Sequence, residues 1–231
     1  MHFHLPKPLH GWREFAGEVG IIVLGVLIAL GFEQVVETLH WRSELAAFRS
    51  ALNREVARDL EYYDYRISHR ACISRRIDDL NRWRDLERSG HDGALLRDIG
   101  RPRILTFDTS VWRSRSPDVS EHMPIDNELA YANMYDSFDG LNAQLLEERD
   151  AWRSLAAFNG AAHLSSDNIM RLSELIYRVK SLDRAIDANG PALRADAAEL
   201  RITPNWGGYR RYTPAHDPDF CKPLLPTADR N

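Results

Sequence analysis

The sequence predicts an all-α protein. An N-terminal transmembrane helix continues into a long amphipathic helix, followed by an antiparallel bundle of three to four helices and an irregular Pro-rich C-terminal tail. Three observations predict this class. One run near the N-terminus is apolar on every side, apolar residues further on recur at spacings of three and four, and no segment alternates convincingly between apolar and polar residues.

The composition narrows the class of protein further. Of the 231 residues, 44% are hydrophobic, which is enough for a substantial core, so most of the chain is not expected to be disordered. A mean hydropathy of −0.44 excludes a polytopic membrane protein but is compatible with one membrane helix. The net charge of −4 argues against nucleic acid as the main partner.

Residues 19–32 form the apolar run, fourteen residues without a charged or strongly polar side chain. A helix of that length rises only about 21 Å, but its flanks extend it to residues 15–36. Trp12 and Trp41 lie 29 positions apart, about 43 Å along a continuous helix, which matches the distance between the two headgroup layers where tryptophans collect. We therefore predict a transmembrane helix over residues 15–36, with the lipid bilayer as its partner and Trp12 and Trp41 at the membrane interfaces.

The apolar run has two other possible interpretations, a secretory signal peptide and an interfacial amphipathic helix. Lys7 and Arg13 precede it and Ala29-Leu30-Gly31 is an acceptable cleavage site, as in a secretory signal peptide. Acidic residues stand where a signal peptide should be basic, and no Pro or Gly after residue 31 opens an extended stretch, so retention is favoured over cleavage. An interfacial amphipathic helix is disfavoured because the run has no polar face.

Basic residues indicate the orientation of the helix weakly. Lys7, Arg13 and the N-terminus precede it, against Arg42 and Arg49 shortly after it, so the N-terminus is expected in the cytoplasm and the downstream domain outside it. Small residues four apart in the helix permit self-association, although such pairs are also frequent in helices that do not associate. These pairs are Ala16 with Gly20 and Gly25 with Ala29.

The pattern divides the chain into an N-terminal segment (1–14), the transmembrane helix (15–36), a helical domain (37–203) and the Pro-rich tail (204–231). Within the domain, the first long helix has charged residues mostly between its apolar positions, and we expect this charged face to be solvated. These residues are Arg54, Glu55, Arg58, Asp59, Arg75, Arg76, Asp78 and Asp79. Loop signals fill 90–123, with a short helix at 109–113. Further helices are predicted from Pro124 to about 155, from Ser165 to about 186, and over 192–200.

The two cysteines, Cys72 and Cys221, are expected to form a disulfide in an oxidising compartment, where the link would hold the tail. Two unrelated thiols remain the alternative for a cytosolic domain. A weaker alternative is a zinc site made of His69, Cys72, His216 and Cys221, because zinc accepts two cysteines and two histidines.

No motif for acyl transfer, nucleotide hydrolysis, dinucleotide binding or a di-iron centre occurs, so no cofactor is predicted and an enzyme is disfavoured. The first hypothesis is therefore a membrane-tethered helical interaction or scaffold module, with an unknown protein partner. The second is an enzyme or small-ligand-binding domain whose site is built from dispersed residues. Its weak candidates are His122, Asp126 and Glu128, or the turn from His216 to Asp219.

The N-terminal pattern resembles a family of uncharacterised bacterial single-pass membrane proteins, most clearly over residues 12–60. It consists of Trp12-Arg13-Glu14, Glu18, the apolar G-x-L-I-A-L run within 22–30, and Glu33-Gln34. Cys72, residues 109–112, residues 122–124 and residues 220–224 more loosely resemble relatives in which both cysteines recur. The resemblance implies a bacterial inner-membrane anchor with an extracytoplasmic, periplasmic helical domain, and it implies no activity.

Overall fold

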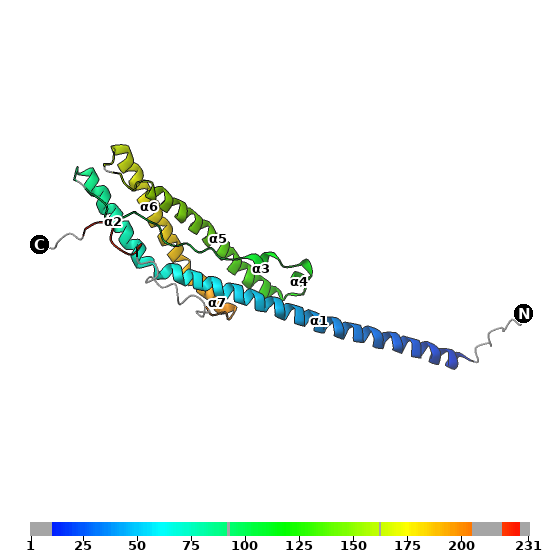
Figure 1. The fold of residues 1–231 in the computed structure, drawn as a ribbon. Coiled ribbons are helices and arrows are strands. Elements are labelled where there is room, and N and C mark those ends of the chain that lie inside the picture. The colour runs from blue at the N-terminus through cyan, green and yellow to red at the C-terminus, as the bar shows by residue number, and fades with distance from the viewer. Residues whose placement is uncertain (1–10, 92, 162, 205–218, 227–231) are drawn as a thin grey trace, which may run out of the picture. The chain divides into compact units, whose positions relative to one another are not determined.

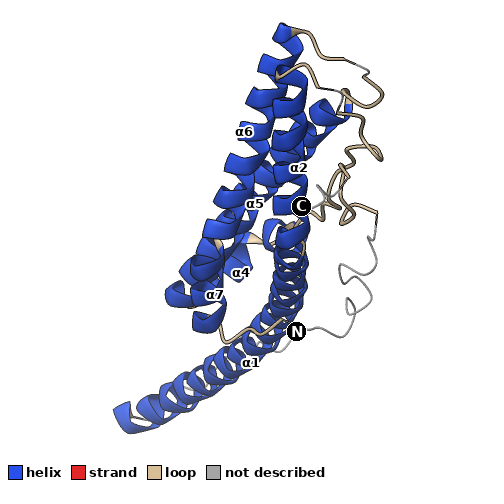
Figure 2. Cartoon of the chain, turned by 90° about the vertical axis from the view of Figure 1, so that its left-hand side faces the viewer, coloured by secondary structure: helices blue, strands red, loops and turns tan. Residues whose placement is uncertain are grey.

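The computed structural model describes residues 11–91, 93–161, 163–204 and 219–226. Every regular element in these ranges is a helix, which confirms the all-α class (Figure 2). The chain divides into two compact units, residues 1–49 and 50–231. The helices are α1 (Trp12–Ser68), α2 (Arg70–Arg88), α3 (Ser110–Arg113), α4 (Pro117–His122), α5 (Ile125–Ala156), α6 (Ser166–Ala188) and α7 (Gly190–Glu199).

The described part of the first unit is the N-terminal stretch of α1, whose apolar side chains are exposed. Ile21 is 75% exposed and Val36 is 65% exposed. A Cβ atom added at Gly20 or Gly25 would meet nothing within 4 Å. Among the described residues, this is the one helix that is long and apolar enough to cross a membrane, and none of its apolar window is buried.

The second unit is a helical bundle (Figure 1). The last turns of α1 run in the same direction as α5, since Asn53 bonds Tyr131 while Arg66, further along α1, bonds Glu148, further along α5. Helix α6 runs antiparallel to both, because Arg66 also bonds Asp183 and Tyr63 bonds the carbonyl of Ile186. The parallel pair requires a long crossover, which residues 89–124 supply.

His69 interrupts the helix that the sequence predicts as continuous from the membrane segment to residue 89. Its main-chain N–H bonds the carbonyl of Arg66, three residues back, and its Nδ1 lies 3.0 Å from the carbonyl oxygen of Tyr65. The side chain thus competes for the carbonyl that an uninterrupted α-helix would use for the main chain. No Gly or Pro marks this break in the sequence.

Serine caps begin two of the later helices. The Oγ of Ser165 accepts a hydrogen bond from the N–H of Asn168 at the start of α6, as the sequence predicts. The Oγ of Ser116 accepts one from the N–H of Val119, and Pro117 occupies the first turn of α4. The sequence predicts loop for this part of 90–123, but Ser116-Pro117 begins a short helix.

The core follows the predicted stripes. Leu52, Val56, Leu60 and Tyr63 of α1 are at most 4% exposed. Helix α7 packs closely against this face at Gly190, where an added Cβ would lie 2.6 Å from the hydroxyl oxygen of Tyr63. Gly190 therefore permits the approach that lets Tyr63 donate its hydroxyl proton to α6.

The charged residues between the stripes are solvated only in part: Arg54, Arg75 and Asp78 are exposed as predicted, whereas four others are buried. Glu55, Asp59, Arg76 and Asp79 are at most 4% exposed. Residues 107–111 cover Glu55 and Asp59 and form hydrogen bonds with both. Residues 219–226 cover Arg76 and Asp79 in the same way. The sequence interpretation was wrong here because helical periodicity locates one buried face, whereas these helices are covered on a second face by irregular chain.

Candidate functional site

The C-terminal segment, defined here as residues 219–226, lies beside α2 in a covalent and hydrogen-bonded arrangement that we call the clasp (Figure 1). The Sγ atoms of Cys72 and Cys221 lie at disulfide distance, 2.10 Å apart, with their Cα atoms 4.8 Å apart. The link closes a chain separation of 149 positions. Both cysteines are partly exposed, so the bond is accessible to solvent.

The disulfide leaves no thiolate for the alternative zinc site. His69 is buried at the junction of α1 and α2, and His216 lies outside the described residues. Within the part of the chain that the structure describes, no group of three or more His, Cys, Asp or Glu side chains is placed to hold a metal ion. The arrangement around Cys72 is therefore that of a structural link.

Side chains of α2 bind the main chain of the C-terminal segment. Arg76 donates to the carbonyl oxygens of Asp219 and Phe220. Asp79 accepts the N–H of Leu224 at 2.7 Å. Three further hydrogen bonds complete the clasp. The guanidinium of Arg75 donates to the carbonyl oxygen of Cys221 at 3.2 Å, and the guanidinium of Arg97 donates to the carbonyl oxygen of Pro223 at 3.0 Å. The N–H of Leu96 donates to the carbonyl oxygen of Leu224 at 2.8 Å.

Three apolar side chains anchor the segment in the core. Phe220, Leu224 and Leu225 are at most 5% exposed and belong to the cluster around Trp152 and Ile77. The rings of Phe220 and Trp152 meet edge to face with centroids 5.7 Å apart. The guanidinium carbon of Arg76 lies 4.9 Å from the centroid of the Phe220 ring.

The free energy that the noncovalent contacts of the clasp contribute is similar in size to the free energy that ordering the segment costs. Burial of the three apolar side chains contributes roughly 5 to 9 kcal/mol. The six main-chain hydrogen bonds add about 1 kcal/mol each. Fixing the backbone of eight residues costs about 8 to 16 kcal/mol. Because these terms nearly cancel, the disulfide decides whether the segment stays in place.

A second cluster of buried polar groups lies under residues 107–111. Glu55 accepts hydrogen bonds from the hydroxyl of Tyr135 at 2.8 Å and from the N–H of Val111 at 3.1 Å. One turn further along α1, Asp59 accepts the N–H of Asp108 at 3.0 Å. Burial raises the pKa of Asp59 to about 8, against the weaker opposing effect of that hydrogen bond. These carboxyl groups hold the loop on α1, which is a structural role.

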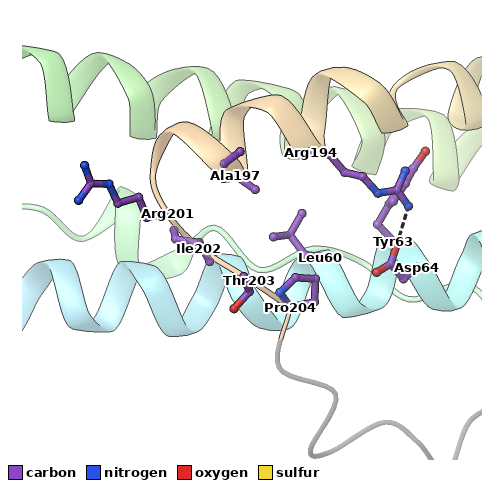
Figure 3. Close-up of a pocket in the computed structure, with 10 residues that line it drawn as sticks. Leu60, Tyr63, Asp64, Arg194, Ala197, Arg201, Ile202, Thr203 and Pro204 are labelled. Atoms are coloured by element: carbon purple, nitrogen blue, oxygen red, sulfur yellow. Dashed lines mark hydrogen bonds and ion pairs between the residues drawn. The ribbon is translucent and has the colours of Figure 1, made fainter.

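A pocket of about 420 Å³ lies between α1 and α7, with Thr203 and Pro204 in its wall (Figure 3). Its walls are mainly apolar. The charged pair at one end, Arg194 and Asp64, is already joined at 2.9 Å, and the guanidinium of Arg201 extends away from Leu60. This arrangement suits a small apolar group and offers no pair of groups for acid–base chemistry. The apolar lining is Leu60, Tyr63, Ala197, Ala198, Ile202 and Pro204.

A more open pocket of about 520 Å³ lies over residues 107–114. Its polar groups are bonded within the protein: Asp108 to Arg58 at 2.9 Å, Arg113 to Asp139 at 2.8 Å, and Asn142 to the N–H and carbonyl of Phe107. Because these polar groups are bonded to other residues of the protein, their role in the pocket is structural.

The dispersed candidates from the sequence do not form a site in the described residues. His122 is exposed at the end of α4, with Nδ1 2.8 Å from the carbonyl oxygen of Asp118. Asp126 and Glu128 occupy the first turn of α5, where carboxylates stabilise the helix dipole. None of the three lines either pocket. Of the His216–Asp219 turn only Asp219 is described, and it pairs with Lys222 at 2.7 Å.

Sequence reasoning missed a buried ion cluster that joins α1, α5 and α6. Arg66 donates to both oxygens of Glu148, at 2.6 and 3.2 Å, and to Asp183 at 2.9 Å. Glu148 is fully buried. Burial opposes the charge of Arg66, but the two carboxylates outweigh it and raise its pKa. No sequence signal distinguishes these residues from the many exposed charges around them.

The apolar surface of α1 is the remaining feature of functional interest. Trp12 is 80% exposed at its start, and Trp41 stands on the same helix with its ring 5.3 Å from that of His40. The structure contains no bilayer, so the position of both tryptophans at membrane interfaces stays a prediction. No protein-family model, curated protein or solved structure matches the chain.

Proposed function

We propose that the chain is a single-pass membrane protein that holds a helical interaction or scaffold domain outside the cytoplasm. The membrane is expected to be the inner membrane of a bacterium, with the N-terminus in the cytoplasm. On this proposal the domain acts by binding. Its protein partner is unknown, and self-association through α1 is one form that the interaction can take.

The observation that carries the proposal is the exposure of the apolar part of α1. Large apolar side chains surround the helix from Val19 to Leu39 and all are at least 40% exposed. A water-exposed surface of this extent is strongly unfavourable, whereas lipid solvates it and the helix satisfies its own backbone hydrogen bonds. The disulfide supports an oxidising location, because such links rarely persist in the cytosol.

Alkaline extraction of membranes tests the anchor. The full-length chain should stay in the pellet at its unprocessed mass. Changing Leu24 and Leu27 together to Lys should move it toward the supernatant, since each Lys costs about 2.5 to 3.5 kcal/mol at the centre of a bilayer. The matched pair of changes to Ala should leave it in the pellet. Full-length wild type in the supernatant contradicts the proposal.

Thiol labelling of intact cells tests the location. Before lysis, a membrane-impermeant maleimide should label Cys72 and Cys221 only after treatment with dithiothreitol, because outside the cytoplasm both cysteines are oxidised yet reachable. The Cys72→Ser variant should leave Cys221 free and labelled without reductant. Cysteines that are free in wild type and labelled only after lysis place the domain in the cytoplasm.

The pocket between α1 and α7 supports a second candidate, a small-ligand-binding domain. Its volume of about 420 Å³ falls in the range of natural ligand sites, and its apolar lining fits a small apolar molecule. Ala198→Phe would fill the pocket. A thermal shift produced by an apolar compound in wild type and lost in this variant would favour this candidate, with Ala195→Phe, outside the pocket, as control.

A further inference from the structure

The clasp has the features of a binding site for a short peptide segment. The side chains of Arg76 and Asp79 bind main-chain atoms, so they recognise the backbone of the segment, which turns over residues 219–222. Specificity comes from the apolar positions that hold Phe220, Leu224 and Leu225. If the C-terminal segment left, it would uncover a groove along α2 beside Trp152.

We infer that this groove also accepts the C-terminal segment of a second copy of the chain, and that the Cys72–Cys221 disulfide controls the exchange. Residues 219–226 are the one occupant that the structure shows to fit the groove, and every copy carries them. Contacts made within one chain can be repeated between two, as in domain swapping. The linked product is a dimer joined by Cys72 of one copy and Cys221 of the other.

The chain length between the bundle and the clasp permits such an exchange. Fourteen residues, 205–218, connect Pro204 to the C-terminal segment. At full extension they reach about 46 to 50 Å, enough to cross to a neighbouring molecule. Two copies held in one membrane would meet at high effective concentration, but the exchange itself requires only the bundle and the tail. The inference is therefore independent of the proposed membrane anchor.

The chemistry is thiol–disulfide exchange. A dithiol donor gives two electrons and two protons, which break the S–S bond and leave Cys72 and Cys221 as thiols while the donor becomes a disulfide. Once the segment has docked on the second copy, a disulfide-bonded oxidant takes back two electrons and two protons and the S–S bond forms between the copies. The partial exposure of both cysteines gives such reagents access.

Mass spectrometry of mixed isotopic samples tests the inference with the wild-type chain. Nitrogen-15-labelled and unlabelled full-length chains are mixed in one detergent, treated with dithiothreitol, reoxidised with oxidised glutathione and digested. We expect peptides that join a heavy Cys72 to a light Cys221. An untreated mixture should contain none. Reoxidised samples in which every link joins peptides of the same isotope would overturn the inference.

Two complementary variants separate specific docking from random collision. A Cys72→Ser chain retains Cys221 and a Cys221→Ser chain retains Cys72, so docking between them yields the mixed disulfide in excess over either homodimer. Adding Leu224→Ser to the first chain removes an apolar anchor and should lower the mixed product by roughly tenfold. Adding Lys222→Ser, at an exposed position, should not. A mixed product in random proportion, or one that Leu224→Ser leaves unchanged, would refute docking in the groove.

Discussion

The carboxylate of Asp79 accepts a hydrogen bond from the main-chain N–H of Leu224 at 2.7 Å, although 145 positions separate the two residues. Its other oxygen accepts a hydrogen bond from the guanidinium of Arg82, one turn along α2. Asp79 thus binds the C-terminal segment through its backbone, seven positions along α2 from the disulfide at Cys72. The contact shows how a charged residue of an apparently solvated face acquires a buried role.

We expect Asp79→Ala to lower the free energy of unfolding by about 1 to 3 kcal/mol, because it leaves the buried N–H of Leu224 without an acceptor. Urea unfolding of the full-length chain in detergent measures the change. Amide exchange at Leu224 should accelerate as well. Asp78→Ala, at the exposed neighbouring position, serves as the matched control and should have little effect. Equal losses from both variants would argue against a role for the bond.

We expect Glu148→Ala to cost about 3 to 5 kcal/mol, since Arg66 would keep its buried charge with only Asp183 as partner. Glu147→Ala is the matched control. Glu147 is the next residue on α5 but pairs with Arg178 at an exposed position, so its loss should cost at most about 1 kcal/mol. Thermal unfolding distinguishes the two, and similar melting temperatures for both variants would contradict the buried cluster.

The sequence predicts those parts of the fold that depend on helical periodicity and capping. The stripe from Leu52 to Tyr63 is buried as expected, and α6 begins at the Ser165 cap. Both signals are local, because a helix face and an N-cap are set by residues three or four positions apart. The pairing of Cys72 with Cys221 was also accessible, since only two cysteines exist.

What the sequence does not predict depends on contacts between distant segments. Asp59 and Arg76 are buried by loop and tail residues whose path follows no periodicity. The break at His69 arises from a side chain competing for a main-chain carbonyl, with no Gly or Pro to signal it. The pocket lined by Leu60 and Ile202 exists only once α7 has packed on α1. Each of these features is decided by tertiary packing.

Stability should fall as the pH rises from about 4 to 8 through the titration of Asp59. In the unfolded chain this carboxyl loses its proton near pH 3.8, whereas in the folded protein its pKa is about 8. Between these values the folded state binds more protons, so the free energy of unfolding decreases with pH, by at most about 1.4 kcal/mol per pH unit.

The Asp59→Asn variant isolates this effect. It should flatten the pH dependence of urea unfolding between pH 5 and pH 8, because the amide keeps an acceptor for the N–H of Asp108 but does not titrate. The pKa of Glu61 is also raised by burial, but Glu61 titrates in both proteins. Its contribution to the pH dependence therefore cancels when the two are compared. Asp126→Asn, at an exposed position, is the control. An unchanged slope in Asp59→Asn would show that the carboxyl is ionised in the folded state.

Replacing Arg201 with Gly should stabilise the protein. Arg201 has a φ of 56°, in the left-handed region that favours glycine, and it follows the last turn of α7. The N–H of Arg201 donates a hydrogen bond to the carbonyl oxygen of Ala198 at 3.0 Å. The N–H of Ile202 donates one to the carbonyl oxygen of Ala197 at 2.8 Å. This is the Schellman pattern, which ordinarily places glycine at the left-handed position.

A glycine there removes the steric cost of the Cβ, so we expect Arg201→Gly to raise the free energy of unfolding by about 0.5 to 1 kcal/mol. Ala198→Gly is the contrasting control. It lies within α7, where glycine costs about 1 kcal/mol, so the same residue type should have opposite effects three positions apart. Thermal unfolding of both variants checks the sign. A loss of stability in Arg201→Gly would mean that contacts of the Arg201 side chain outweigh the strain of its backbone.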